Sequence, residues 1–390
     1  MTGAHWHLIT GEYPPQAGGV ADYTAILARA LDASGCDVHI WAPAVTDGES
    51  DGGRVHVHRL PGGFGDAGLH TMTAELERLG GPRVMLVQYV PQAFGARGMN
   101  VAFCRWVQHR TREHRDDVRV MFHEPYYPFV FWPLRRNLLA LVNRLMAVLL
   151  LSDIRVAYVS TEAWQRRLRR YAPRARNFVW LPIASTVPRA ADEGRIGDWR
   201  AWVAPTPEAR VVGHFGTYGP LVTRLLAPAL ARVLSLHDEA RLCLVGEGGD
   251  ALANRLCADR PEWRSRVTAT GHLAADEVAA CLRACDVMLQ PYADGASGRR
   301  TTLMAALVNG VPVVTNRGRA TEPVWDTSGA VVFPNHALPE SLGDAVVQLL
   351  NNPDRCRRVA TAGAALYAAQ FAIARTVGVL LSPGGRPAAP

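Results

Sequence analysis

The amino-acid sequence predicts an α/β protein with two doubly wound, Rossmann-like domains in tandem, facing a cleft. Short apolar runs alternate with helical segments of about 10 to 15 residues, which is typical of βαβ units and a parallel sheet. The alternation breaks once, where proline, alanine, glycine and charged residues accumulate, and then resumes. With 390 residues, the chain is long enough for two or three domains.

In the first half, apolar and β-branched runs predict the strands, and periodic apolar segments between them predict the helices. The expected strands are 6–10, 37–42, 55–60, 83–88, 119–122, 156–159 and 178–181. The expected helices are 20–33, 71–79, 101–114, 138–151 and 162–171. These elements form a first domain at 1–185, which is followed by an interdomain linker at 186–207.

The second half repeats the alternation and predicts a second domain at 208–360. Its expected strands are 211–215, 242–245, 267–270, 287–289, 311–315 and 330–333, and its expected helices are 221–236, 275–284, 301–308 and 339–350. The alanine-rich segment 361–381 predicts a helix that packs back on the first domain, and 382–390 reads as a disordered tail.

Composition limits the class of protein. The formal net charge is +7 and every basic residue is arginine, so an anion site here uses arginine, backbone amides or histidine. Seven cysteines without a CxxC pair indicate ordinary thiols in a reducing compartment. The N-terminus lacks the features of a secretory signal, and we therefore expect a cytoplasmic protein.

The longest apolar stretch, 138–151, is shorter than the roughly 20 residues that a membrane span needs. It is either a buried helix or a helix on a membrane surface, because Arg135, Arg136 and Arg144 flank it. The basic run at 164–176 favours a solvated helix face, an anionic membrane or a lipid-linked acceptor over nucleic acid.

The loop at 294–302 is the most informative segment. It joins an apolar strand to a helix and contains Arg299 and Arg300 beside the helix start, which Thr301 or Thr302 can cap. Unpaired amides and the positive end of the helix dipole favour an anion there. The loop therefore predicts a site for a phosphate-bearing ligand.

Three other loops follow expected strands. Gly18 and Gly19 open a helix, where a ligand can approach the backbone closely, although a plain tight turn is the alternative. His123 ends a strand and can act as a general base or as a hydrogen-bonding group, with an ordinary core histidine as the alternative. The run LVGEGGD at 244–250 formally fits a dinucleotide fingerprint, but the next strand ends without the acidic residue that the ribose needs.

Other motifs are absent from the sequence. HExxH fails at Tyr127, GxSxG fails around Ser297, and no DxD pair occurs. The sequence therefore predicts no metal site.

Taken together, four segments resemble the GT-B glycosyltransferases of the retaining family 4 type: GEYPPQAGGVADYT, HEPY, LVGEGGD and a late block that runs from DVMLQPY to GAVVFP. The resemblance covers roughly residues 6 to 350. It implies a metal-independent, retaining transfer of a sugar from a nucleotide-sugar donor to an acceptor hydroxyl, with no other cofactor. The first domain would be the acceptor side and the second domain the donor side.

The resemblance also implies site residues. His123 and Glu124 are the expected catalytic residues. The expected donor-binding residues are Gly18, Gly19, Gly216, Thr217, Arg224, Gly246, Ser297, Arg299, Arg300, Thr301, Thr302 and Glu322. The family's two glutamates would fall at Ser297 and Ala305, and its cationic pair would fall near Thr217 and Val222. We expect Arg224, Arg299 or Arg300 to replace that pair.

Two alternatives follow from these departures. One is a non-catalytic subunit that binds a nucleotide sugar or a partner protein. The other is a GT-B sugar-nucleotide epimerase or hydrolase, which would turn over the donor without an acceptor. For the transferase we expect an acceptor that is a glycan or is lipid-linked, a role in glycan or glycoconjugate biosynthesis, and a peripheral membrane contact.

Overall fold

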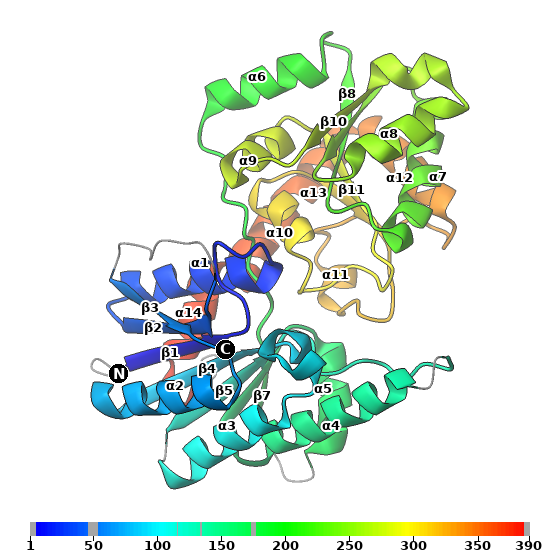
Figure 1. The fold of residues 1–390 in the computed structure, drawn as a ribbon. Helices are drawn as coiled ribbons and strands as arrows, with labels where there is room; N and C mark the ends of the chain where they lie inside the picture. Colours follow the sequence, from blue (N-terminus) through cyan, green and yellow to red (C-terminus); the bar gives the residue numbers. More distant parts are fainter. Residues whose placement is uncertain (1–4, 46–53, 115, 133–134, 173–176, 386–390) are drawn as a thin grey trace. The chain divides into compact units, whose positions relative to one another are not determined.

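The computed structural model describes residues 5–45, 54–114, 116–132, 135–172 and 177–385 (Figure 1). The chain divides into two compact units, one of Met1–Ile183 with Ile373–Pro390 and one of Ala184–Ala372. Each unit is built on a parallel sheet, so the predicted fold class of two Rossmann-like α/β domains is confirmed.

The sheet of the first unit has seven parallel strands in the order β3-β2-β1-β4-β5-β6-β7. The strands are β1 His5–Thr10, β2 Asp37–Pro43, β3 Val55–Leu60, β4 Arg83–Tyr89, β5 Asp117–Phe122, β6 Val156–Val159 and β7 Asn177–Trp180. The helices are α1 Gly19–Ala33, α2 Asp66–Leu79, α3 Val101–Glu113, α4 Arg135–Asp153, α5 Glu162–Leu168 and α14 Ile373–Leu381. Short 3₁₀ turns are η1 Pro91–Phe94, η2 Ala96–Gly98, η3 Arg169–Tyr171 and η6 Pro383–Gly385.

Helices α2, α3 and α4 cover one face of this sheet. Met72, Phe103 and Met146 from these helices pack with Val87 and Val120 of the central strands in one apolar core. Burial of such side chains is worth roughly 1.5 to 3 kcal/mol each, which explains why the apolar runs in the sequence locate the strands.

The sheet of the second unit has five strands in the order β10-β9-β8-β11-β12. The strands are β8 Arg210–Phe215, β9 Ala240–Val245, β10 Val267–Gly271, β11 Val287–Gln290 and β12 Val313–Thr315. The α-helices are α6 Glu193–Val203, α7 Pro220–Leu236, α8 Gly249–Ala258, α9 Ala275–Arg283, α10 Thr301–Val308, α11 Val324–Thr327, α12 Pro339–Leu350 and α13 Pro353–Leu366. A 3₁₀ helix, η4 Pro261–Arg266, and a π-helix, η5 Tyr367–Phe371, complete the unit.

Two expected elements of this half differ in the structure. Residues 330–333 form no strand, because Val332 alone makes a bridge to Val314. Residues 186–207, expected to be a linker, lie within the second unit and contain α6. Asp192 caps α6 by accepting from Arg195 N at 3.0 Å, and Trp199 Nε1 donates to Glu277 at 2.8 Å. This helix is held by polar contacts and by an indole hydrogen bond. Its sequence lacks the apolar periodicity from which a helix is predicted, and for this reason it was not expected.

The C-terminal segment also differs from the expected single helix at 361–381. By length and composition alone, Pro353–Leu381 could cross a membrane. However, Ala372 has an extended backbone, and the boundary between the two units falls directly after it. In the first unit, Arg119 Nη1 donates to the carbonyl of Leu380 at 2.6 Å, which ties α14 to the sheet. We therefore interpret this segment as separate helices of the two units rather than as one continuous span. Residues 386–390 of the expected disordered tail lie outside the described residues, and Pro383–Gly385 form a turn that accepts from Tyr158 OH at 3.0 Å.

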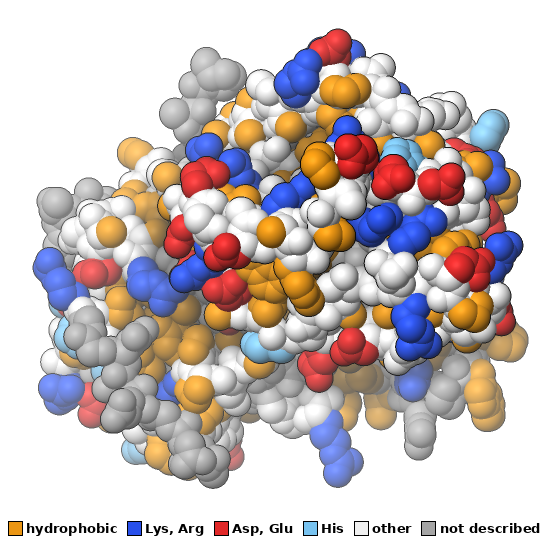
Figure 2. All heavy atoms as spheres, turned by 90° about the horizontal axis from the view of Figure 1, so that it is seen from above, with side chains coloured by type: hydrophobic (Ala, Val, Ile, Leu, Met, Phe, Trp, Pro, Cys, Tyr) orange, Lys and Arg blue, Asp and Glu red, His pale blue; other side chains and the backbone are white. Residues whose placement is uncertain are grey.

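Arginine side chains are interspersed with acidic ones on the face of the molecule drawn in Figure 2. Basic and acidic side chains are therefore mixed on that face, and no large patch of one sign is drawn there. The sequence-based expectation that nucleic acid is not a partner stays a prediction.

Candidate functional site

The carboxyl edge of the second sheet has the topology of a ligand site. Strand β8 lies between β9 and β11, so the connections after β8 and after β11 lead to opposite sides of the sheet. In open α/β sheets, such a switch point opens a crevice beyond the strand ends, where ligands bind. The loops that follow β8, β9, β11 and β12 meet at this edge.

The loops after β8 and β9 contact each other through their backbones. Gly216 N donates to Val245 O at 3.1 Å, and a Cβ on Gly246 would lie 2.3 Å from Gly216 O. Gly246 also has a φ of 112°, a conformation that favours glycine. The expected donor residues Gly216 and Gly246 are therefore brought together, while Thr217 beside them is exposed.

A hollow of about 520 Å³ opens between the start of α7 and that of α8. Tyr218, Thr223, Gly248 and the two arginines Arg224 and Arg255 line it. The structure thus places the expected donor residue Arg224 beside the loops after β8 and β9.

The loop after β11 contains the two arginines that the sequence singled out. Arg299 Nη2 donates to Asp294 Oδ2 at 2.7 Å, and Arg300 Nη2 donates to the other oxygen of the same carboxylate. Asp294 is buried, and one carboxylate between two guanidinium groups leaves a local net charge of +1. A phosphate at this position would share both arginines with Asp294, a partner that the sequence did not suggest.

Glu322, which follows β12, holds this loop in place. Its Oε1 and Oε2 accept from Gly298 N at 3.2 and 3.1 Å, and its Oε2 accepts from Trp325 Nε1 at 2.8 Å. The residue is 2% exposed. Glu322 was expected to contact a donor, but in this structure both carboxylate oxygens have protein donors and the side chain acts as a brace.

Helix α10 begins at Thr301 with Arg300 at the N-cap position and no side-chain cap. Thr302 Oγ1 instead lies 2.8 Å from Tyr292 OH, and the guanidinium of Arg300 stacks 4.8 Å from the centre of the Tyr292 ring. The expected capping by Thr301 or Thr302 is thus wrong. The first-turn amides of a helix have no intrahelical partner, so this end of α10 suits an anion.

Three buried side chains at this edge have polar atoms without hydrogen-bond partners among the described residues. They are His214 Nε2 near the end of β8, both amide atoms of Gln290 at the end of β11, and Ser297 Oγ in the loop after β11. Buried polar groups are nearly always paired in folded proteins, so a cluster of exceptions at a crevice indicates a ligand site.

Sequence reasoning identified Ser297 but missed His214 and Gln290. A polar residue closing an otherwise apolar strand, as in VVGHF and VMLQ, is the signal that could have found them. His214 Nδ1–H donates to Leu289 O at 2.7 Å, and burial lowers the pKa of His214 to about 4. His214 is therefore neutral at pH 7, with Nε2 as an acceptor.

In the first unit, the strand ends carry the other expected residues. Glu12 Oε1 accepts from the amides of Val20 and Ala21 at 3.1 and 3.2 Å, at the start of α1. A Cβ on Gly18 would lie 2.4 Å from the same oxygen, whereas Gly19 is exposed with open space around it. Gly18 and Gly19 were expected to let the backbone approach a donor diphosphate, and the two amides that follow them are already paired with a carboxylate of the same loop.

His123 lies at the end of β5 and is buried, whereas its neighbour Glu124 is exposed. His123 Nε2–H donates to Gln88 Oε1 at 2.7 Å, and Tyr23 meets the ring edge-on. Burial lowers the pKa of His123 to about 3, so at neutral pH it is a weak proton acceptor but an effective hydrogen-bonding group.

Comparisons with known proteins give the class of this fold. Residues 209–352, which contain the loops of the second sheet, match the family model described as "Glycosyl transferases group 1". Across the whole chain, the fold is that of the GT-B glycosyltransferases.

Three solved structures illustrate this likeness. Sucrose-phosphate synthase from Thermosynechococcus elongatus has 17% identity and a TM-score of 0.71, over 97% of this chain and 98% of that one. HepE from Anabaena, in complex with UDP-glucose, has 14% identity and a TM-score of 0.66, over 96% of this chain and 98% of that one. A candidate UDP-N-acetylglucosamine 2-epimerase from Listeria monocytogenes has 13% identity and a TM-score of 0.60, over 97% of this chain and 95% of that one. No curated protein sequence matches the chain significantly.

Proposed function

We propose that this protein is a glycosyltransferase that moves a sugar from a nucleotide-sugar donor to an acceptor hydroxyl. One observation carries the proposal: buried polar atoms of His214, Gln290 and Ser297, at the switch point of the second sheet, have no hydrogen-bond partner among the residues that the structure describes. They lie within the segment that matches the glycosyltransferase group 1 model.

The chemistry of these side chains suits a sugar. A sugar hydroxyl both donates and accepts, and the Gln290 amide, the Ser297 hydroxyl and the lone pair on His214 Nε2 offer both functions. A site built from such groups rejects analogues that leave them unpaired, which favours a polyhydroxylated ligand over an apolar one.

We propose that Arg299, Arg300 and the start of α10 stabilise the diphosphate leaving group. Negative charge grows on that group as the glycosidic bond breaks, and fixed cationic donors in a protected site are the most effective catalytic device for such charge. Arginine is permanently charged and forked, so it suits a diphosphate without a lysine or a metal ion. Retention of anomeric configuration and metal independence are further parts of this proposal.

His123 would hydrogen-bond to a hydroxyl rather than remove its proton. Its Nε2–H is engaged by Gln88, and the low pKa leaves Nδ1 as a neutral acceptor. A small polar acceptor of this kind can orient a hydroxyl, while the leaving group itself can serve as the base in a retaining transfer.

A panel of UDP-, GDP-, ADP- and dTDP-sugars tests the proposal. Binding is followed by ligand-detected NMR and turnover by release of the nucleoside diphosphate, with wild type beside a Gln290→Ala variant. We expect one nucleotide class to bind, with slow release that an acceptor accelerates, and we expect at least about tenfold weaker binding in the variant. Absence of binding across the panel would overturn the proposal.

Two alternatives keep specific support. Ser297 and Ala305 stand where the resemblance implies glutamates, and Asp294 already engages both arginines, which fits a subunit that binds a nucleotide sugar or a partner without catalysis. The epimerase-like structural neighbour fits a sugar-nucleotide epimerase or hydrolase. Binding without turnover under any acceptor would favour the first, and donor turnover without an acceptor would favour the second.

We also propose a peripheral membrane contact from the cytoplasmic side, through an exposed apolar surface on the first unit. We call it the aromatic–leucine surface, and it lies on the segment before α4 and on α4 itself. Its members are Phe129, Phe131, Trp132, Leu138, Leu141 and Leu145. Phe131 and Trp132 are 98% and 78% exposed. Leu138, Leu141 and Leu145 recur at helical spacing, and the remaining face of α4 packs into the core.

Arginines accompany this surface. Arg144 Nη1 donates to Tyr127 O at 3.1 Å, and its guanidinium lies 3.9 Å from the centre of the Phe129 ring, which fastens the aromatic loop to α4. Arg136, Arg166, Arg169 and Arg170 are exposed. An apolar stripe with aromatic residues and neighbouring arginines is typical of helices that lie on anionic membranes, and it suits a lipid-linked acceptor.

A further inference from the structure

A row of imidazoles covers one face of the first sheet at its outer strands. Side chains alternate between faces along a strand, and the register of β1, β2 and β3 places five imidazoles, one carboxylate and one indole on the same side. They are His5 and His7 on β1, Asp37, His39 and Trp41 on β2, and His56 and His58 on β3. Strands at this position normally carry apolar residues, so five histidines beside one carboxylate call for an explanation.

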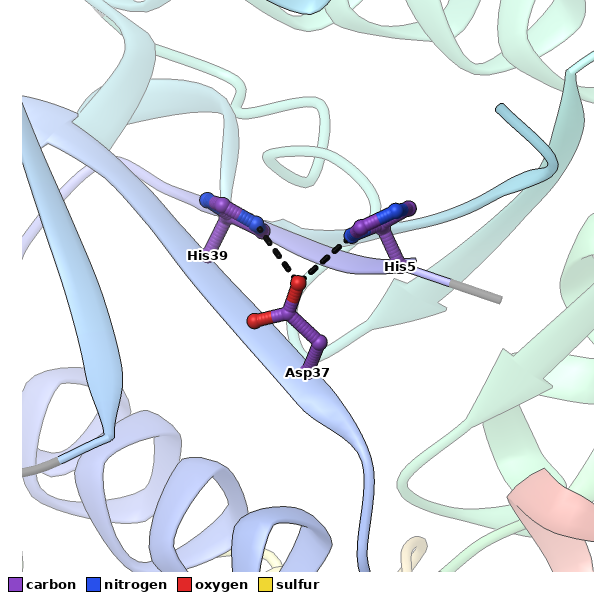
Figure 3. Close-up of side chains that lie close together, drawn as sticks. All are labelled: His5, Asp37 and His39. Carbon is purple, nitrogen blue, oxygen red and sulfur yellow. Dashed lines mark hydrogen bonds and ion pairs between the residues drawn. The ribbon is translucent and has the colours of Figure 1, made fainter. Parts of the chain in front are cut away.

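At the amino edge of this row lie His5, Asp37 and His39, which form one group (Figure 3). The Asp37 carboxylate lies between the two imidazoles, with Oδ2 at 2.6 Å from His5 Nδ1 and 3.4 Å from His39 Nε2. One ligand atom from each residue lies within 4.8 Å of the other two.

We propose that His5, Asp37 and His39 form a binding site for a divalent transition-metal ion, with Zn²⁺ as the representative ion. Imidazole nitrogen and carboxylate oxygen are ordinary zinc ligands, bound at about 2.0 to 2.2 Å in a tetrahedral arrangement. Ligand atoms in such a tetrahedron lie about 3.4 Å apart, close to the separation of Asp37 from His39.

A second, independent observation points to a ligand. His39 is 3% exposed, and its Nε2 makes no hydrogen bond to any residue that the structure describes. This buried nitrogen lies 3.4 Å from Asp37 Oδ2, an oxygen that already accepts from His5. A metal ion between them would give the nitrogen a partner.

The site is open on one side and has a fourth group within reach. The side chains of His5 and Asp37 are 31% and 42% exposed, so an ion can enter from solvent. His56 Nε2 lies 3.5 Å from Asp37 Oδ1 and is 56% exposed. The fourth ligand would be His56 or a water molecule.

Binding would change the tautomer of His5. Without metal, His5 Nδ1–H donates to Asp37; with Zn²⁺ bound, Nδ1 would offer its lone pair to the ion and the ring proton would lie on Nε2, exchanged through solvent, so the imidazole stays neutral. Two imidazoles favour Zn²⁺, Co²⁺ or Ni²⁺ over Mg²⁺ and Ca²⁺, which prefer oxygen ligands.

The position in the fold indicates a structural role. His5 and Asp37 are the first residues of β1 and β2, at the amino edge of the sheet and therefore away from the carboxyl edge that carries Glu12 and His123. An ion there would join two strands that are about 30 residues apart in sequence and close the loop between them.

The test uses the full chain after dialysis against EDTA, with ZnCl₂ as the probe. Binding is followed by isothermal titration calorimetry, bound zinc by elemental analysis after gel filtration, and stability by the unfolding midpoint. His39→Gln and Asp37→Asn remove ligands, and His70→Gln, at an exposed histidine on α2, is the matched control. Tetrahedral Co²⁺ gives a visible absorption band. This band would not appear if the three residues only stabilised the fold without binding a metal ion.

We expect about one Zn²⁺ per chain, a raised unfolding midpoint with Zn²⁺ but not with Mg²⁺, and a Co²⁺ band. The two ligand variants should weaken binding by at least about tenfold, while His70→Gln binds as wild type does. Asp37 is partly exposed, so its variant carries the test if His39→Gln does not fold. Equal zinc binding in wild type and Asp37→Asn, or no binding in wild type, would overturn the proposal.

Discussion

Glu12 accepts a hydrogen bond from the amide of Val20 across eight residues of chain, at 3.1 Å. The carboxylate therefore caps α1 from the preceding loop, in the position that a ligand phosphate would take at a helix start. Gly18 makes this possible, because a Cβ there would lie 2.4 Å from the Glu12 oxygen.

We predict that Glu12→Ala lowers the free energy of unfolding by about 1 kcal/mol, the usual loss when a helix cap is removed. Gly18→Ala should cost a similar amount, because the new Cβ displaces the Glu12 carboxylate. The two losses should not add, since both remove the same contact. Urea unfolding of the two single variants and the double variant measures this. Additive losses would show that Gly18 has another role, and Glu113→Ala, at an exposed glutamate on α3, is the control.

A second prediction concerns the brace at Glu322. Glu322→Ala leaves the Gly298 amide and the Trp325 indole without their acceptor, and we expect a loss of about 3 kcal/mol in the free energy of unfolding. Trp325→Phe removes one donor and keeps the ring, so its loss should be smaller. If both variants unfold at the wild-type urea concentration, Glu322 does not hold the loop.

The arginine pair can be tested directly. We expect the double variant Arg299→Ala, Arg300→Ala to weaken binding of the nucleotide-sugar donor by at least about tenfold, because each charged hydrogen bond is worth roughly 1.5 to 3 kcal/mol. Ligand-detected NMR titration measures this loss. Arg317→Ala removes an arginine from the neighbouring loop, where it pairs with Asp326, and should bind as wild type does. Wild-type affinity in the double variant would remove these arginines from the site.

Buried histidines predict a dependence of stability on pH. Burial lowers the pKa of His214 from an ordinary value of 6.5 to about 4, so the unfolded chain binds a proton that the folded chain does not. Stability should therefore fall as the pH drops from about 6.5 towards 4, by about 2 to 3 kcal/mol for this residue.

His214→Gln should show a smaller loss of stability between pH 7 and 4.5 than wild type does, in urea unfolding at each pH. His272→Gln, at an exposed histidine of the same unit, should keep the wild-type slope. Identical slopes in all three proteins would contradict a buried, neutral His214.

The aromatic–leucine surface predicts binding to vesicles. We expect the double variant Phe131→Ser, Trp132→Ser to bind vesicles of phosphatidylcholine and phosphatidylglycerol at least about tenfold more weakly than wild type does. The reason is that both side chains would bury apolar area in the membrane. Co-sedimentation at low ionic strength measures this. Leu236→Ser alters an exposed leucine on the other unit and should leave binding unchanged. If no protein sediments with vesicles, the membrane contact is excluded.

Much of the candidate site could be predicted because parallel strands bring their carboxyl ends to one edge. The sequence placed Gly216, Gly246, Ser297 and Arg299 in loops that follow expected strands, and these loops meet in the structure. It did not reveal Asp294 as the partner of both arginines, because the rotamers of three neighbouring side chains decide that pairing. It also missed α6, which Trp199 and Arg200 hold in place without an apolar stripe.

The sequence by itself determined the two α/β domains, since apolar periodicity is local and every strand must bury its own residues. Tertiary structure alone decided what lies next to each polar group. The register of β1, β2 and β3 brings His5, Asp37 and His39 together although no motif links them, and the path of one loop carries Glu12 to the start of α1. Hydrogen bonds and metal ligation depend on distances of a few ångströms between residues that are distant in sequence, so only the packed chain determines them.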